Sequence, residues 1–501
     1  MDPVAGDPVA GDPVAGYIEP DGAPAESVAP LSNHGGAPPR GLARVPRSSV
    51  DHGRYGRMFR ELRPFRPDDA SLKALADSMG PYPPMPSGAS SGAPAALAAL
   101  QPGENPDIPA GYTYVGQFVD HDITFDPTSV LERRNDPDAV VNFRTPRFDL
   151  DLIYGSGPAD APFLYDQDDP YKLLIGRNRG RTQERDDLPR NAQGRALIGD
   201  PRNDAHVIVS QLTLAILRFH NAVVDDLRRR SFPDATLFAE AQRVTRWHYQ
   251  WMVVEDYLAR LVGPDVLRRV LVVDPADGRR HAELNHFTWK RAPFMPVEFS
   301  AAAYRFGHSQ IRATYVLNPD LEPKHIMLPM LDPDPLEHLG GFRPLPKGWK
   351  ISWDLFFAIG GSAPQLSRRI DTLVVGPIGQ LPPVLDHARR SLALLDMLRG
   401  KALGLPSGQA VAAAMGTSRS DLRLTGETPL WYYLLRESEV DSGGARLGPT
   451  SATIVAEVLV GLLAADPSSF LRAAPTWTPE LPSAQAGHFT MADLLRFAGA
   501  A

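Results

Sequence analysis

The chain has 501 residues, of which 43% are apolar and 22% are charged, a composition typical of a soluble globular protein with a large hydrophobic core. Its net charge of −7 argues against a nucleic-acid binder, because phosphate binding requires a basic surface. Cysteine is absent, which excludes disulfides, thiolate nucleophiles, zinc–thiolate sites and cysteine-held iron–sulfur clusters.

The N-terminal segment, residues 1–47, is predicted to be disordered. Residues 2–16 are three copies of "DPVAG", and the stretch that follows is rich in Pro, Gly, Ala and Ser. Such a segment buries too little apolar surface to offset the entropy of the chain, and three short copies are too few for a solenoid. The segment also lacks the basic and apolar regions of a secretory signal. A cytoplasmic location and export by a non-classical route therefore both stay open.

A globular composition begins at about Ser48, and the first elements after it are short. "SLKALADSM" (Ser71–Met79) predicts a helix with Ser71 as its N-cap. "GASSGAPAA" (Gly88–Ala96) predicts a loop that enters a short helix. Residues 126–200 are rich in Asp, Pro, Gly and Arg without periodicity, which predicts a long irregular segment that is functional or held by other parts of the chain.

The rest of the chain is helical in pattern. Apolar residues at helical spacing predict long helices over Ile208–Arg230 and Ala239–Gly263, the second ending at its glycine, and a third over Ser451–Asp466. No uninterrupted apolar run reaches about 18 residues, so no membrane span is predicted. Strands and helices do not alternate, which argues against a doubly wound sheet. The predicted class is therefore mainly α, with long loops and little β-structure.

The first candidate site is "GQFVDHDITF" (Gly116–Phe125), where Asp120 and Asp122 flank His121 inside an apolar frame. Taken alone, the triplet is most often a solvated or capping turn, and a core histidine paired with a carboxylate is a second ordinary outcome. A zinc site needs three or four ligands at fixed spacing, and the chain has no HExxH or Cys/His pattern to supply them.

The other candidate stretches are also weak when each is taken alone. In "TPRFDLDLIYGS", a hydroxyl and alternating carboxylates suit a hard cation such as calcium, although the spacing is not that of an EF-hand and, for this stretch alone, a polar loop is the better interpretation. His308 in "YRFGHSQIR" fits a buried structural histidine, and Arg202 in "GDPRNDAH" fits a surface charge. His220 and His248 lie within predicted helices and are interpreted as structural.

Taken together and in order, these stretches resemble one family. "GQFVDHDITF", "TPRFDLDLIYGS", "GDPRND" leading into "LRFHN", "YRFGH" and "LLDMLRGKALGLP" are similar to the haem peroxidases of the animal (cyclooxygenase- and myeloperoxidase-like) superfamily, and to its bacterial members most of all. The resemblance covers roughly Ser48 to Leu471. It implies a mainly helical peroxidase fold with haem b between central helices, and residues 48–501 as the catalytic domain.

The resemblance also assigns expected roles to individual residues. His121 matches the distal histidine, with Gln117 and Arg202 as the distal glutamine and arginine. His308 matches the proximal histidine that ligates the haem iron, and Arg305 matches an arginine that supports the haem. The expected calcium ligands are Asp122, Thr145, Arg147 (through its backbone oxygen), Asp149 and Asp151.

Departures from the family pattern refine these expectations. Asp120 matches a carboxylate that esterifies a haem methyl, whereas Ala205 and His206 stand where relatives form other covalent links, so at most one ester is expected. Asp396 replaces the asparagine that accepts a hydrogen bond from the proximal histidine. A carboxylate there lowers the iron potential and weakens a chloride-oxidising interpretation. Arg305 stands where the lipid dioxygenases carry a radical-forming tyrosine, which favours a peroxidase.

The expected activity is therefore a peroxidase that reduces hydrogen peroxide through a ferryl intermediate and oxidises organic donors or easily oxidised halides. A neutral imidazole can move the peroxide proton between the two oxygens, and a fixed guanidinium stabilises the charge that develops. Two alternatives stay open: a haem fatty-acid dioxygenase, and a calcium-stabilised, non-catalytic binding protein of the same fold.

Overall fold

The computed structural model describes residues 53–80, 103–125, 141–142, 144–176, 186–290, 292–328, 334–379, 381 and 391–501. The segment 1–47 and the loop predicted at Gly88–Ala96 lie outside the described residues. Most of the predicted irregular segment is described. Its described residues contain a two-residue strand, short helical turns and isolated β-bridges.

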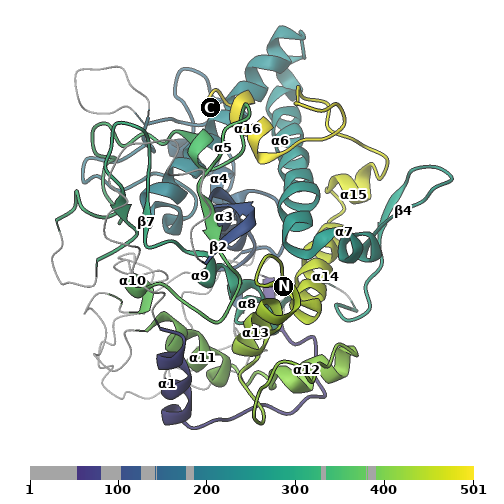
Figure 1. The fold of residues 1–501 in the computed structure, drawn as a ribbon. Helices are drawn as coiled ribbons and strands as arrows, with labels where there is room; N and C mark the ends of the chain where they lie inside the picture. The colour runs from purple at the N-terminus through teal and green to yellow at the C-terminus, as the bar shows by residue number, and fades with distance from the viewer. Residues whose placement is uncertain are drawn as a thin grey trace, which may run out of the picture.

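Helices dominate the described chain (Figure 1). The α-helices are α1 Asp69–Ser78, α3 Gly111–Ile123, α4 Asp151–Tyr154, α5 Val207–Arg229, α6 Asp234–Trp251, α7 Ala259–Val270, α8 Val297–Ser300, α9 Gly307–Gln310, α10 Gly376–Gly379, α11 Leu392–Ala402, α12 Gly408–Met415, α13 Leu430–Ser442, α14 Pro449–Ala465, α15 Phe470–Ala473 and α16 Met491–Phe497. A π-helix, η5 (Met252–Leu258), joins α6 to α7, and the 3-10 helices are η3 Pro162–Leu164, η4 Pro201–Asp204, η6 Ala303–Phe306 and η7 Trp353–Leu355.

The strands are short and pair in small sheets. They are β1 Gly53–Gly56, β2 Glu104–Pro109, β3 Val141–Asn142, β4 Leu271–Val273, β5 Arg280–Ala282, β6 Met295–Pro296, β7 Thr314–Tyr315, β8 Lys324–His325 and β9 Leu366–Arg368. One sheet has the order β3-β1-β6, and the remaining pairs are β2-β9, β4-β5 and β7-β8. The predicted mainly α class with little β-structure is confirmed.

The predicted helices that fall within the described residues occur, with differences at their ends. The first helix begins at Asp69, three residues before the start that Ser71 as N-cap would give, because the Asp68 carboxylate accepts a hydrogen bond from the backbone N–H of Ser71; Ser71 as the N-cap was therefore wrong. In the second long helix the chain passes through the π-helix η5, and helical geometry is interrupted at Gly263, with φ of 75°. A helical turn resumes at Pro264 and carries α7 to Val270.

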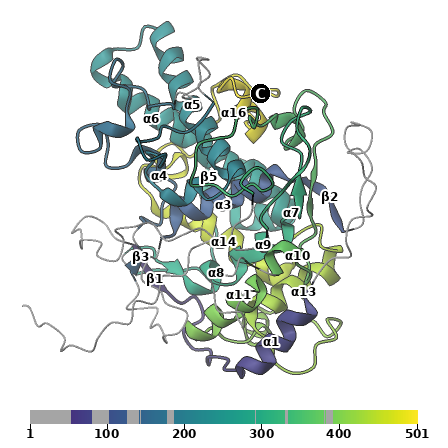
Figure 2. The ribbon, with the colours of Figure 1, turned by 90° about the vertical axis from the view of Figure 1, so that its left-hand side faces the viewer.

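Long helices form the centre of the molecule. α5 packs along α6, α14 packs along α7, and α3 is enclosed by α5, η4, η5 and α9 (Figures 1 and 2). α3 has eleven buried residues, so it is a core helix in spite of its charged triplet. Of the described helices, α5 alone has the length and mean hydropathy of a membrane span, but 83% of its apolar window is buried inside the protein.

Candidate functional site

α3 carries four of the predicted site residues: Gln117, Asp120, His121 and Asp122. Residues four apart share a face of an α-helix, whereas consecutive residues are rotated by about 100°. Gln117 and His121 therefore lie on one face, while Asp120 and Asp122 point to either side. Asp120 is half-buried, and both His121 and Asp122 are fully buried.

Asn203 in η4 holds the His121 ring. His121 Nδ1 lies 2.6 Å from the Asn203 side-chain oxygen, and both residues are fully buried. Burial, followed by the nearby positive charge of Arg202, lowers the pKa of His121 to about 4. The imidazole is therefore neutral at ordinary pH. With the amide oxygen facing Nδ1, that nitrogen carries the proton, and Nε2 has the lone pair that a general base needs.

Arg202 lies against the C-terminal end of α3. Its Nη2 donates to the backbone oxygens of His121 at 2.9 Å and Thr124 at 2.5 Å, and its guanidinium lies 4.7 Å from the centre of the Phe125 ring. A cation at this end of a helix satisfies carbonyls that have no helical partner and interacts favourably with the helix dipole. These contacts fix the backbone that carries His121.

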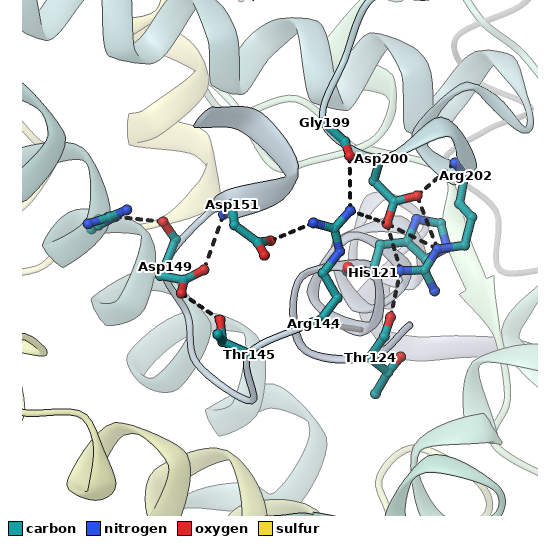
Figure 3. Close-up of polar contacts among 10 residues, drawn as sticks. His121, Thr124, Arg144, Thr145, Asp149, Asp151, Gly199, Asp200 and Arg202 are labelled. Atoms are coloured by element: carbon teal, nitrogen blue, oxygen red, sulfur yellow. Dashed lines mark hydrogen bonds and ion pairs between the residues drawn. The ribbon is translucent and has the colours of Figure 1, made fainter. Parts of the chain in front are cut away.

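A chain of buried ion pairs extends from Arg202 (Figure 3). Asp200 Oδ2 lies 2.7 Å from Arg202 Nη2 and 2.8 Å from Arg144 Nη2. Arg144 Nη1 in turn lies 2.9 Å from Asp151 Oδ1. Burial alone would raise the pKa of Asp200, but Arg202 and Arg144 hold it below its ordinary value. Asp200 is therefore ionised and shared between two guanidinium groups.

The far end of this chain is a cluster of three carboxylates. Oxygens of Asp122, Asp149 and Asp151 all lie within 4.8 Å of one another. Within the described part of the chain, neither oxygen of the fully buried Asp122 makes a hydrogen bond of good geometry, and the Tyr249 hydroxyl is the neighbouring donor. Burial, with Asp149 and Asp151 as further causes, raises the pKa of Asp122 well above its ordinary value. A carboxylate that is buried beside two others is stabilised in its ionised form when a cation binds to it.

Two further predicted ligands lie in the same loop as the carboxylates. Thr145 Oγ1 donates to Asp149 Oδ2 at 2.7 Å (Figure 3). Arg147 follows it and donates its backbone N–H to the Thr145 backbone oxygen at 2.8 Å. The predicted cation ligands Asp122, Asp149 and Asp151 thus converge, with the Thr145 hydroxyl bonded to one of them.

Gln117 has a partner that the sequence did not suggest. Its side-chain oxygen lies 2.7 Å from His206 Nε2, in the residue that caps α5. Asn203, Asp200 and Arg144 were also missed, since each is an ordinary polar residue in a loop. For Asn203 and Asp200, the available signal was adjacency to Arg202 in "GDPRND".

The second imidazole is held by a carboxylate. His308 in α9 is buried, and its Nδ1 lies 2.5 Å from Oδ2 of the buried Asp396 in α11. Arg305 Nη1 lies 3.6 Å from the other Asp396 oxygen. The structure therefore brings these three predicted residues together. Because α9 contacts α3, the elements bearing His308 and His121 are neighbours.

The remaining helical histidines make structural contacts, in agreement with their interpretation from sequence. The His220 ring nitrogens lie 3.0 Å from the Tyr154 hydroxyl and 2.9 Å from the Tyr171 backbone oxygen. His248 bonds the Val244 backbone oxygen at 2.7 Å, and its other ring nitrogen accepts backbone N–H groups from the C-terminal region.

Sequence and structure define one class of protein. A family model described as animal haem peroxidase matches residues 128–420, which is more than half of the chain. The chain therefore belongs to the animal haem peroxidase family. Membership of its bacterial branch stays a prediction.

Curated relatives and solved structures are similar at low identity. A chorion peroxidase of Drosophila melanogaster is 31% identical over 134 residues, 26% of this chain and 16% of that protein. One of Aedes aegypti is 23% identical over 304 residues, 59% of this chain and 37% of that protein. The chain thus spans well under half the length of these relatives.

Two solved structures share the fold. Peroxidase A of Dictyostelium discoideum superposes with a TM-score of 0.57 at 12% identity, covering 89% of this chain and 93% of that chain. A fatty acid alpha-dioxygenase of Arabidopsis thaliana superposes with a TM-score of 0.53 at 16% identity, covering 81% and 72%. Peroxidases and dioxygenases of this family thus share one architecture, and local residues have to distinguish them.

Proposed function

We propose that this protein is a haem-dependent peroxidase that reduces hydrogen peroxide and oxidises small organic donors or easily oxidised halides. One observation carries the proposal: two buried imidazoles on contacting elements are each held through Nδ1, His121 by Asn203 and His308 by Asp396. In each ring, Nε2 is the second nitrogen, which would ligate iron or transfer a proton. The ring held by a carboxylate suits iron ligation, and the ring held by a neutral amide suits proton transfer.

His308 suits the role of iron ligand. A carboxylate that accepts from Nδ1–H fixes the ring orientation and makes the imidazole a stronger donor. Arg305 lies beside the same carboxylate and partly balances its charge. Asp120 is the candidate for one ester link, although its Oδ1 accepts a hydrogen bond from the Thr124 hydroxyl at 3.0 Å. Bound haem would supply the redox chemistry, while the protein supplies placement and electrostatic field.

His121 suits the role of general base and acid. Its neutral Nε2 can take a proton from one peroxide oxygen and return it to the other, which then leaves as water. The Asn203 oxygen keeps the ring in this tautomer and stabilises the cation that forms when Nε2 is protonated. Arg202 holds the backbone oxygen of His121, so the ring is fixed from both the side chain and the main chain.

The carboxylate cluster is proposed to bind calcium. Oxygen ligands of carboxylates, a hydroxyl and a backbone carbonyl are those calcium prefers, and Asp122, Asp149 and Asp151 already converge. Thr145 and the Arg147 backbone oxygen would complete the set. The ion would neutralise a fully buried carboxylate that lies beside two others.

A fatty-acid dioxygenase is the second candidate, because the Arabidopsis thaliana alpha-dioxygenase has the same fold. The residue three positions before His308 weighs against it, since Arg305 cannot form a phenoxyl radical. The two candidates differ in co-substrate. A dioxygenase consumes oxygen with an unsaturated fatty acid and no added peroxide, whereas the proposed enzyme requires peroxide.

The proposal is tested by one optical experiment on protein purified with haem. We expect a Soret band that shifts within seconds of adding stoichiometric hydrogen peroxide, and a slower shift in His121→Ala. His220→Ala is the matched control, because it removes a buried imidazole that has structural partners only. No Soret band after haem supplementation would leave the non-catalytic, calcium-stabilised protein as the better interpretation.

A further inference from the structure

His206 lies at the junction between α5 and α3 and makes a contact with each. Its Nδ1 accepts a hydrogen bond from the backbone N–H of Val209 at 3.3 Å, so the imidazole is the N-cap of α5. Its Nε2 lies 2.7 Å from Gln117 Oε1 on α3. The ring is buried and packs edge-on against Tyr114, with the ring centres 5.0 Å apart.

The cap determines the tautomer of this ring. A backbone N–H can only donate, so His206 Nδ1 must present its lone pair to Val209. A neutral imidazole has one donor and one acceptor, and Nε2 therefore carries the proton. That proton points at Gln117, whose amide must accept through its oxygen. The amide nitrogen of Gln117 is then turned away from His206.

We propose that His206 is a positioning residue that fixes the Gln117 amide in one orientation, with the amino group presented as a hydrogen-bond donor on the face of α3 that carries His121. The inference rests on the proposed function for its consequence: the side of α3 that carries His121 favours an anionic ligand or developing negative charge. The same arrangement disfavours a ligand that would have to donate a hydrogen bond to Gln117.

Two properties of the site keep the arrangement in place. Burial lowers the pKa of His206 to about 3, so the ring is neutral and keeps both its donor and its acceptor at ordinary pH. The backbone of His206 is also fixed, because it bridges to Gly340 and the next residue, Val207, donates to the Leu339 oxygen at 2.8 Å. A shorter cap such as Asn or Ser would satisfy α5 but would not reach Gln117.

The first test uses haem-free protein and needs no activity. In ¹⁵N-histidine-labelled wild type, the His206 signals, assigned by their loss in His206→Asn, should show an unprotonated Nδ1 and a protonated Nε2 from pH 5 to 8. A protonated Nδ1 would overturn the proposal whether or not the protein binds haem. This result is therefore separable from failure of the proposed function.

The second test separates positioning from capping. Asn is among the strongest N-caps. The melting temperature of His206→Asn should therefore fall no further than that of the control variant His220→Asn. Cyanide is the probe of the haem-loaded protein, and its dissociation constant should rise about 2- to 12-fold in His206→Asn, the worth of one net hydrogen bond.

Gln117→Leu completes a double-mutant cycle. If His206 acts through Gln117, adding His206→Asn to Gln117→Leu causes no further loss of cyanide affinity. Additive losses would show that His206 affects cyanide binding by a route other than Gln117 and would overturn the proposal. If haem is not retained, the same cycle is measured on the unfolding of haem-free protein, where additivity again counts against the Gln117 contact.

Discussion

The carboxylate cluster allows a prediction that does not depend on haem. Oxygens of Asp122, Asp149 and Asp151 lie within 4.8 Å of one another. Two unit charges at that distance repel by about 3 kcal/mol at an effective dielectric constant of about 20. Protonation of Asp122 and the ion pair of Asp151 with Arg144 relieve part of this repulsion. In a calcium chelator, Asp122→Asn should therefore be more stable than the wild type by about 2 kcal/mol.

Calcium should reverse this order. At a free concentration about 1,000 times its dissociation constant, a ligand that binds only the folded state adds about 4 kcal/mol. The wild type should gain this amount, whereas Asp122→Asn should gain little because it lacks a buried anionic ligand. The stability curves of the two proteins, measured by urea unfolding of haem-free protein, should therefore cross between chelator and millimolar calcium.

The control is Asp168→Asn, which removes an exposed carboxylate from the same stretch of chain. This variant should follow the wild type in both conditions. Equal wild-type stability in chelator and in calcium would refute the cation site. A loss of stability for Asp122→Asn in chelator would refute the argument that the three charges repel one another.

Three further predictions concern single residues. His121→Ala should slow the reaction with peroxide by about 10²- to 10⁴-fold in stopped-flow measurements, and an unchanged rate would exclude it as the base. Asp396→Asn should raise the midpoint potential of bound haem in a redox titration and lower haem affinity by about 10- to 100-fold; an unchanged potential would contradict the role of the carboxylate. Burial raises the pKa of Glu437 from 4.5 to about 7, so the folded state binds the extra proton and stability falls by about 3 kcal/mol as pH rises from 4.5 to 7. Urea midpoints across this range should show a smaller fall in Glu437→Gln, and parallel curves would refute the assignment.

Periodicity was sufficient for the long elements of the fold. α5 and α14 occur within two residues of their predicted ends, because apolar residues at helical spacing have one stable way to be buried. The π-helix η5 was not predicted, because all of its residues except Glu255 are buried and the segment therefore has no one-sided apolar pattern that could show a change of helical pitch. The start of α1 moved because Asp68 caps it with a carboxylate three residues before the predicted cap.

The partners of the site residues could not be derived from sequence. Asn203 reaches His121 across 82 positions, and Arg202 reaches the Thr124 oxygen across 78. Such pairings depend on how α3 packs against η4, which no local pattern encodes. The resemblance to a family identified His121 and His308 as the functional imidazoles. Their hydrogen-bond partners, and the tautomers inferred from those partners, came from the three-dimensional structure.

The arrangement explains why a charged triplet lies in a buried helix. Three consecutive residues point in three directions: Asp120 bonds Thr124, His121 bonds Asn203, and Asp122 joins the carboxylate cluster. Ion pairs through Asp151, Arg144, Asp200 and Arg202 then connect that cluster to the His121 backbone oxygen. A cation at the cluster would compete with Arg144 for Asp151. It would thereby change the series of ion pairs whose other end is the contact of Arg202 with the His121 backbone oxygen. The cluster is thus placed to set the position of the candidate base as well as the stability of the fold.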